Sequence, residues 1–261
     1  MFGAWFWIPG SLALLAPRND SDRFREGAMA ETLPIVLVPG LTCTARLYTP
    51  QIEALWPFGP VMVADHRRDA DIKAVAARIL SNAPPRFALA GLSFGGYIGF
   101  EMMRQARERI AKLALLDTSA RPDTPEQTAT RKTWIAMAQS GRYDEIPDLS
   151  IPRYLHRDRQ NDSAMTGVVR QMIGVTGAEA FVRQLQAIMS RPDSRPLLPS
   201  IRCPTLVLVG DGDIATPPEL HQEIAVGIPG ARLVIVPNCG HLSTIERPEA
   251  VNAALSAWLE A

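Results

Sequence analysis

The sequence is poor in cysteine. Only three of its 261 residues are cysteines, and Cys43, Cys203 and Cys239 show no paired spacing. This excludes a disulfide framework and favours a reducing compartment, so we expect a cytoplasmic protein with free thiols. Cys43 could act as a nucleophile only if a neighbouring group lowered its pKa, and the sequence around it offers no such group.

Neither sign of charge is in excess, because 27 Lys and Arg residues balance 27 Asp and Glu residues. We therefore expect no nucleic acid and no anionic membrane as a partner. The four histidines share no metal-ligand spacing, and no glycine pattern fits a nucleotide, so neither a metal nor an organic cofactor is implied. Three of these histidines, His66, His156 and His221, are expected at the surface.

The sequence also lacks an apolar run long enough for a comfortable transmembrane helix. The apolar stretch 1–16 is interrupted by Pro9-Gly10, and it has neither the basic start nor the cleavage site of a good signal peptide. Met29 could serve as a second start, just before the first predicted strand. We predict that residues 1–33 are a dispensable N-terminal extension; a weak membrane anchor is the less favoured alternative.

Six short apolar runs have the pattern of strands buried on both faces. Helical spacing of apolar residues alternates with them, which predicts a parallel sheet with right-handed crossovers. The expected fold class is α/β, with a mostly parallel sheet of about six strands flanked by helices. The predicted strands span 34–38, 61–64, 87–90, 113–116, 204–209 and 233–236.

The alternation stops over residues 121–198, where no strand-like run occurs. Helical patterns occupy 125–140, 163–173 and 178–190. The connections between them, including 146–148, are polar or rich in proline. Because the apolar helix faces must pack on something, we predict a helical cap, residues 121–198, over the mouth of the sheet. The core then consists of residues 34–120 and 199–261.

A Gly-x-Ser-x-Gly turn, Gly91 to Gly95, joins the third predicted strand to a helix. Such a turn presents a serine as a nucleophile at the edge of a parallel sheet, and a Cβ at either glycine would collide with a neighbouring strand or helix. Taken alone, the five-residue pattern is more often a glycine-rich turn with an exposed serine. Side chains at other strand ends decide between these interpretations.

Two such side chains are Asp213, after the fifth strand, and His241, after the sixth. At the carboxyl edge of the sheet they would meet Ser93. An imidazole can take the serine proton, and a carboxylate can fix the tautomer of the ring and stabilise the imidazolium. Asp211 is the second choice for the acid; its other interpretation is a turn residue that accepts backbone N–H groups.

The oxyanion hole can be predicted as well. One donor would be the backbone N–H of Phe94, directly after the serine, and the other the backbone N–H of Leu41, after the first strand. Gly40 would let that second loop approach the substrate carbonyl.

Three stretches, 91–96, 210–217 and 238–248, resemble the α/β-hydrolase fold superfamily. The resemblance covers roughly residues 34–260, and it implies a serine hydrolase with a cap and with Asp213 as the acid. The chain departs from the family where members commonly have His-Gly and it has Pro39-Gly40. The usual first two antiparallel strands are also missing, which implies a reduced sheet.

The function expected from this resemblance is hydrolysis of a small carboxylic ester through an acyl-enzyme. A lactonase, a carbon–carbon bond hydrolase and a low-turnover small-molecule receptor remain alternatives. The zero net charge and a generic apolar cap favour an uncharged ester. Arg191 and Arg195 could instead hold a substrate carboxylate, or they could pin the cap to the core. We expect a monomer or a homodimer.

Overall fold

The computed structural model describes residues 32–261, so the predicted extension, residues 1–33, lies outside it except for its last two residues. Within this range six strands form one sheet in the order β2-β1-β3-β4-β5-β6, and all neighbouring pairs are parallel. The predicted fold class is confirmed. The strands are β1 Ile35–Val38, β2 Val61–Val63, β3 Phe87–Leu92, β4 Ile110–Leu116, β5 Thr205–Gly210 and β6 Arg232–Val236.

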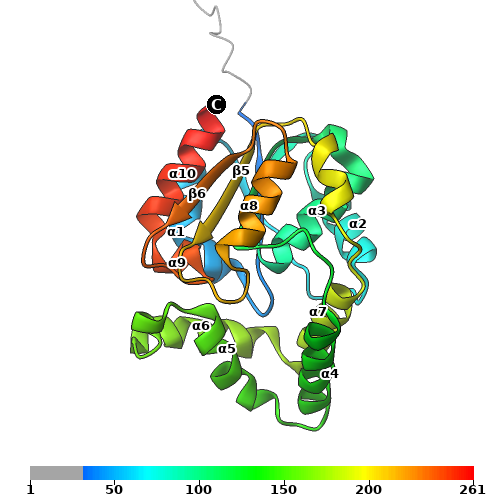
Figure 1. The fold of residues 1–261 in the computed structure, drawn as a ribbon, viewed down its shortest axis with the longest axis vertical. Coiled ribbons are helices and arrows are strands. Elements are labelled where there is room, and N and C mark those ends of the chain that lie inside the picture. Colours follow the sequence, from blue (N-terminus) through cyan, green and yellow to red (C-terminus); the bar gives the residue numbers. More distant parts are fainter. Residues whose placement is uncertain (1–31) are drawn as a thin grey trace, which may run out of the picture. The chain divides into compact units, whose positions relative to one another are not determined.

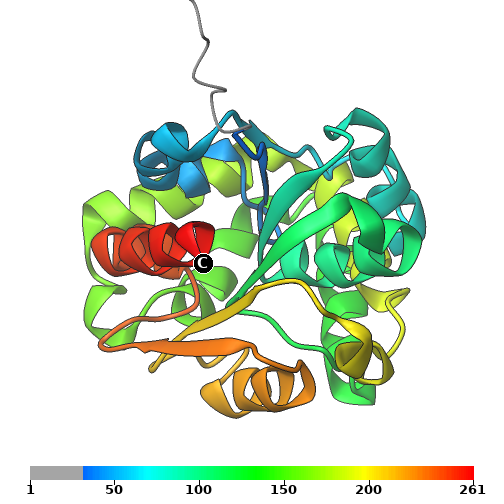
Figure 2. The ribbon, with the colours of Figure 1, turned by 90° about the horizontal axis from the view of Figure 1, so that it is seen from above.

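Helices flank the sheet (Figure 1, Figure 2). α1 packs against α10 and α2 packs against α3, while α8 lies against β5 and β6. Because helices cover the sheet, β1, β3 and β5 are buried along their whole length, which explains their unbroken apolar sequences. These helices are α1 Thr49–Leu55, α2 Ile72–Asn82, α3 Phe94–Ala106, α8 Pro218–Gly227 and α10 Pro248–Glu260, and the short α9 Ser243–Glu246 precedes α10.

Strand β4 begins at Ile110, three residues earlier than predicted. The added segment contains Lys112, a residue that is rare in a buried strand. Its ammonium group donates hydrogen bonds to the carbonyls of Trp258 and Leu259, at 3.2 and 2.7 Å. A cation is favourable at this point, because the C-terminus of α10 carries partial negative charge.

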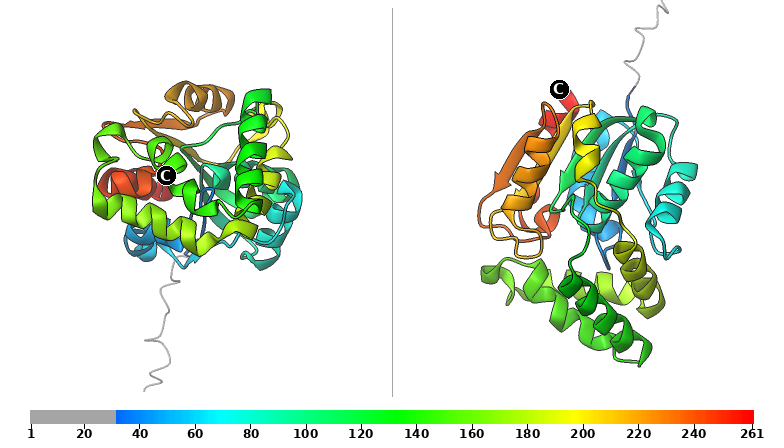
Figure 3. Two further views of the ribbon diagram at one scale, coloured as in Figure 1. Left: turned by 90° about the horizontal axis from the view of Figure 1, so that it is seen from below. Right: turned by 45° about the vertical axis from the view of Figure 1, so that its right-hand side comes forward.

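Four α-helices between β4 and β5 form the cap, which lies beyond the carboxyl ends of the strands (Figure 1, Figure 3). Their bounds are α4 Pro125–Gln139, α5 Ile146–Tyr154, α6 Ser163–Thr176 and α7 Ala178–Met189. No helix among residues 32–261 has the length and apolarity to cross a membrane.

Helix α5 was not predicted, because its two prolines favoured an irregular connection. Pro147 lies in the first turn, where the missing N–H has no intrahelical partner to lose. Pro152 lies inside the helix, where it removes one N–H donor from the helical hydrogen bonds. Ile146, Ile151 and Tyr154 are buried, and this packing stabilises the helix despite its two prolines.

Candidate active site

Ser93 lies in the sharp turn between β3 and α3. Its backbone has φ +56° and ψ −112°, a conformation that residues with a side chain rarely adopt. A Cβ on Gly91 would meet the backbone of Gly95, and a Cβ on Gly95 would meet the carbonyl of Val38. The predicted need for both glycines is confirmed, because they allow α3 to start this close to β1.

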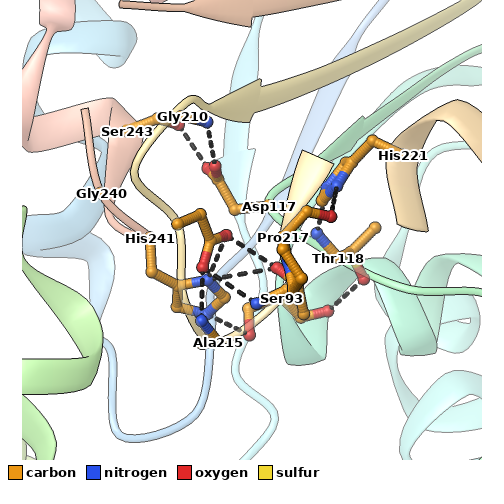
Figure 4. Close-up of polar contacts among 12 residues, drawn as sticks. Ser93, Asp117, Thr118, Gly210, Ala215, Pro217, His221, Gly240, His241 and Ser243 are labelled. Carbon is orange, nitrogen blue, oxygen red and sulfur yellow. Dashed lines mark hydrogen bonds and ion pairs between the residues drawn. The ribbon is translucent and has the colours of Figure 1, made fainter. Parts of the chain in front are cut away.

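Three loops at the carboxyl edge of the sheet bring Ser93, His241 and Asp213 together. Ser93 and His241 are labelled in Figure 4. Nε2 of His241 lies 2.8 Å from Oγ of Ser93, and Nδ1 of His241 lies 2.8 Å from Oδ2 of Asp213. A carboxylate oxygen only accepts, so Nδ1 carries the proton in this arrangement and Nε2 is free to accept the serine proton. The structure thus brings together the three side chains that the sequence singled out.

The environment of Asp213 favours its charged form. Its side chain is buried, which by itself would raise the pKa of the carboxyl. The neighbouring His241 and the hydrogen bonds from Thr216 outweigh this effect, so the pKa of Asp213 lies below its ordinary value. The N–H groups of Ala215 and Thr216 donate to Oδ1, and the Thr216 hydroxyl donates to Oδ2. These donors hold the carboxylate toward the imidazole.

Asp211, the second choice for the acid, is exposed and points elsewhere. Its Oδ1 accepts the backbone N–H of Cys239 at 3.1 Å. It therefore has the geometry of the turn residue that the sequence offered as its other interpretation.

The two predicted oxyanion donors have free backbone N–H groups. Neither the N–H of Leu41 nor that of Phe94 donates a hydrogen bond within residues 32–261. Phe94 is the first residue of α3, where the helix carries partial positive charge. A Cβ on Gly40 would lie 3.5 Å from the Cβ of Ser93, so the loop that carries Leu41 closely approaches the serine.

Cys43 is unsuited to nucleophilic attack. Its side chain is buried, and this burial raises the pKa of the thiol to about 12. The reactive thiolate is therefore scarce at neutral pH. In the described part of the chain, no group of three or more His, Cys, Asp and Glu side chains is arranged to hold a metal ion.

The sequence profile of the Alpha/beta hydrolase family matches residues 3–254. This chain belongs to that family. A relative from Mycobacterium tuberculosis, BpoC, whose name describes a non-heme bromoperoxidase, is 30% identical over 194 residues, which cover 70% of each chain.

Two solved structures are similar to this alpha/beta hydrolase over most of their length. A thermophilic esterase from Thermogutta terrifontis, solved with malate bound, is 33% identical, with a TM-score of 0.80 over 87% of this chain and 89% of that one. The enol-lactonase from Burkholderia xenovorans is 27% identical, with a TM-score of 0.80 over 88% and 92%. Esterases and lactonases are thus among the relatives.

In this alpha/beta hydrolase the loop of residues 39–42, named here the oxyanion loop, is held by His66 and Gln184. Nε2 of His66 lies 3.0 Å from the carbonyl oxygen of Pro39, and Nδ1 of His66 lies 2.9 Å from the side-chain nitrogen of Gln184. Oε1 of Gln184 accepts the N–H of Thr42 at 3.1 Å. A histidine from another loop and an amide from the cap therefore brace the loop that lacks the usual His-Gly.

Two more cap side chains bind the same loop. The hydroxyl of Thr176, on α6, donates to the carbonyl of Thr42 at 3.1 Å, and the hydroxyl of Tyr154, on α5, donates to the carbonyl of Leu41 at 3.3 Å. The Tyr154 ring also stacks on His241, with centroids 5.8 Å apart. The cap therefore contacts both the oxyanion loop and the histidine.

The prediction that His66 and His221 lie at the surface was wrong. His66 is 2% exposed and His221 is fully buried, and burial lowers the pKa of each to about 4. Nε2 of His221 accepts the N–H of Thr118 at 2.7 Å, so the neutral ring satisfies a buried backbone group (Figure 4). His156 is only partly buried. The sequence did contain one indication that His66 lies near the site, because His66 follows a strand as the catalytic candidates do.

Asp117, at the end of β4, is a buried acid that the sequence did not single out. Its Oδ1 accepts the N–H of Gly210, and its Oδ2 accepts the hydroxyl of Ser243 (Figure 4). Burial raises the pKa of Asp117 well above its usual value, and the charge of Asp213 raises it further. Asp117 thereby links β4 to β5 and α9 beneath the loops of the site.

A cavity of about 300 Å³ opens at Ser93 and His241. The core contributes Leu41 and Tyr97 to its wall, and the cap contributes Trp134 among others. A volume of this size suits a small ligand.

Proposed function

We propose that this chain is a serine hydrolase that cleaves a small carboxylic ester through an acyl-enzyme. The observation that carries the proposal is the unbroken hydrogen-bonded series from Ser93 through His241 to Asp213, with 2.8 Å at each step. Ser93 and His241 line a cavity of suitable size for a small ester, and the relatives include an esterase. This geometry matches what a serine needs to become a nucleophile at neutral pH.

In the proposed mechanism, Oγ of Ser93 attacks the ester carbonyl carbon while Nε2 of His241 takes the hydroxyl proton. The N–H groups of Leu41 and Phe94 stabilise the negative oxygen, and Asp213 stabilises the imidazolium. The proton then passes to the leaving alcohol as the carbon–oxygen bond breaks. His241 next takes a proton from water, the resulting hydroxide attacks the acyl carbon, and the acid leaves as Ser93 recovers its proton.

A lactone is a cyclic ester, so the same steps would open it, and the similarity to an enol-lactonase favours lactones as a second substrate class. A carbon–carbon bond hydrolase and a low-turnover receptor are the remaining alternatives. Turnover of an ester panel separates the hydrolase from the receptor, because a receptor would bind ligands with negligible turnover.

The decisive experiment measures hydrolysis of p-nitrophenyl acetate and butyrate by the wild type and by Ser93→Ala. We expect a loss of at least a thousandfold in kcat for the variant. A fluorophosphonate should label the wild type at Ser93 and leave the variant unlabelled. Equal turnover by both proteins would refute the serine mechanism.

We also propose a cytoplasmic location. The three cysteines, Cys43, Cys203 and Cys239, are free thiols, as in a reducing compartment. Alkylation in intact cells, followed by mass spectrometry under denaturing conditions, should find all three reduced; a disulfide would contradict the proposal.

A further inference from the structure

The cavity at Ser93 is rich in arginine. The core side of its wall includes Ser93 and His241, and the cap supplies several charged side chains. Glu126 is the one lining carboxylate among the described residues. The lining arginines are Arg121, Arg131, Arg153 and Arg191.

Two of these arginines share one buried carboxylate. Nε of Arg131 lies 2.6 Å from Oδ2 of Asp123, and Nη1 of Arg191 lies 2.7 Å from Oδ1 of the same side chain. The Asp123 side chain is 4% exposed and that of Arg191 is 6% exposed. One negative charge thus faces two positive charges in a poorly solvated place, which leaves positive charge for a ligand to balance.

Both arginines also keep unused donors. Nη1 of Arg131 and Nη2 of Arg191 make no hydrogen bond within residues 32–261, although their other nitrogens do. Neither of these nitrogens is fully buried, and both side chains line the cavity. A guanidinium N–H in such a site is satisfied best by a charged oxygen acceptor.

The other two arginines differ in their partners. Arg121 pairs with Glu223 at 2.9 Å, so its charge is largely balanced. Arg153, on α5, is exposed, and it takes part in none of the ion pairs found among residues 32–261. The four lining arginines carry four positive charges. Their partners Asp123 and Glu223, together with Glu126, carry three negative charges, so one positive charge is in excess.

Ser93 and these two arginines line one and the same cavity. The Arg191 guanidinium stacks on the ring of Tyr97, 4.1 Å from its centroid. Tyr97 follows Ser93 by one turn of α3, and its N–H donates to the Ser93 carbonyl. Because this cavity has a volume of only about 300 Å³, a small substrate could reach from the serine to the arginines.

We propose that the substrate is an ester or lactone that carries a free carboxylate a few bonds from the reacting carbonyl. The carboxylate binds the unused donors of Arg131 and Arg191, and Arg153 adds long-range attraction. The single excess positive charge matches a monoanion better than a doubly charged phosphate. This inference rests on the proposed serine hydrolase, and it replaces our expectation of an uncharged ester.

The test compares esters that differ only by a carboxylate in place of a terminal methyl. Monomethyl glutarate is paired with methyl valerate, and 3-acetoxypropanoate is paired with propyl acetate, so the charge is tested on the acyl and the alcohol side. Hydrolysis is followed by proton release. We expect the anionic ester of at least one pair to have a kcat/KM at least tenfold above its neutral partner.

The arginines are then tested by Arg191→Gln and Arg153→Gln, with Arg195→Gln as control. Arg191→Gln still leaves Asp123 paired with Arg131, and the control removes an arginine that pairs with Asp193 outside the cavity. We expect both cavity variants to lower the anionic-to-neutral ratio of kcat/KM, at least tenfold for Arg191→Gln, and the control to keep it. Misfolding would lower both rates and leave the ratio unchanged, and fluorophosphonate labelling reports folding independently.

The outcomes separate the two proposals. Hydrolysis that depends on Ser93 without any preference for the anionic esters would overturn the carboxylate proposal alone. A preference that survives in both cavity variants would overturn it as well. A protein that hydrolyses no ester of either kind would overturn the proposed function itself.

Discussion

Gln184 of the cap and His66 of the core form one hydrogen-bonded pair, with 2.9 Å between the amide nitrogen and Nδ1. The same amide binds the N–H of Thr42, and the same ring binds the carbonyl of Pro39. The oxyanion loop is therefore held at both ends by a contact that crosses from the core to the cap.

Replacing Gln184 by Leu should impair catalysis more than binding. The variant leaves the Thr42 N–H and Nδ1 of His66 without partners, so the Leu41 donor would lose its fixed position. We expect kcat on an ester to fall about tenfold or more, with KM changed less than threefold.

The matched control is Gln186→Leu, because Gln186 lies exposed on the same helix. It should behave as the wild type in steady-state kinetics. A proportional loss of kcat in both variants would point to damage to α7 rather than to the loop.

Asp213→Asn should lower kcat at least a thousandfold, because the amide cannot stabilise the imidazolium and can favour the wrong tautomer of His241. Asp211→Asn should change kcat by less than threefold, since among residues 32–261 the Asp211 side chain accepts a hydrogen bond only from the Cys239 N–H. Measuring both variants with one ester decides between the two acids. A larger loss for the Asp211 variant would assign the acid role to the other residue.

Two glycines of α3 should respond to alanine in opposite ways. At Gly95 a Cβ would meet the carbonyl of Val38, so Gly95→Ala should unfold the turn or displace α3. At Gly99 the nearest atoms, from Leu89 and Leu115, are 3.7 and 3.9 Å away, which is ordinary contact. Gly99→Ala should therefore raise the free energy of unfolding by ~0.5–1 kcal/mol, through helix propensity. Urea denaturation of both variants checks the contrast.

The two buried histidines should make stability fall in mild acid. In the folded chain the pKa of His66 and of His221 is about 4, and in the unfolded chain it is near 6.5. Between these values the unfolded state binds more protons, so stability is lost as pH falls from about 6.5 to about 4. Each ring should contribute a loss of ~3 kcal/mol over this window.

The contribution of one ring is isolated by comparing the wild type with His221→Gln. Urea denaturation at several pH values between 7 and 4.5 should show a shallower pH dependence for the variant. Parallel curves would mean that His221 does not remain neutral in the folded protein.

The sequence predicted the strands and the three residues Ser93, Asp213 and His241 because both depend on local patterns. An apolar run identifies a buried strand, and its end identifies the edge of the sheet where polar side chains meet. The choice of Asp213 over Asp211 needed more, namely the family resemblance, because both residues follow the same strand.

The remaining features depend on contacts between distant segments. Gln184 lies 118 residues from His66, and nothing in either neighbourhood indicates the pair. The buried state of His66 was missed for the same reason, since its partners belong to the oxyanion loop and the cap. Arg191 was left with two interpretations because its partner Asp123 lies at the other end of the cap.

The contacts of Gln184, Thr176 and Tyr154 with the oxyanion loop restrict how this enzyme scaffold can be redesigned or can diverge. A cap transplanted from another family member would change the substrate pocket, but it would also remove the groups that hold the loop. Such a chimera would need an amide and two hydroxyls at equivalent places, or a new brace within the core. Under the proposed mechanism, a change of cap would therefore alter substrate selectivity and catalytic rate together.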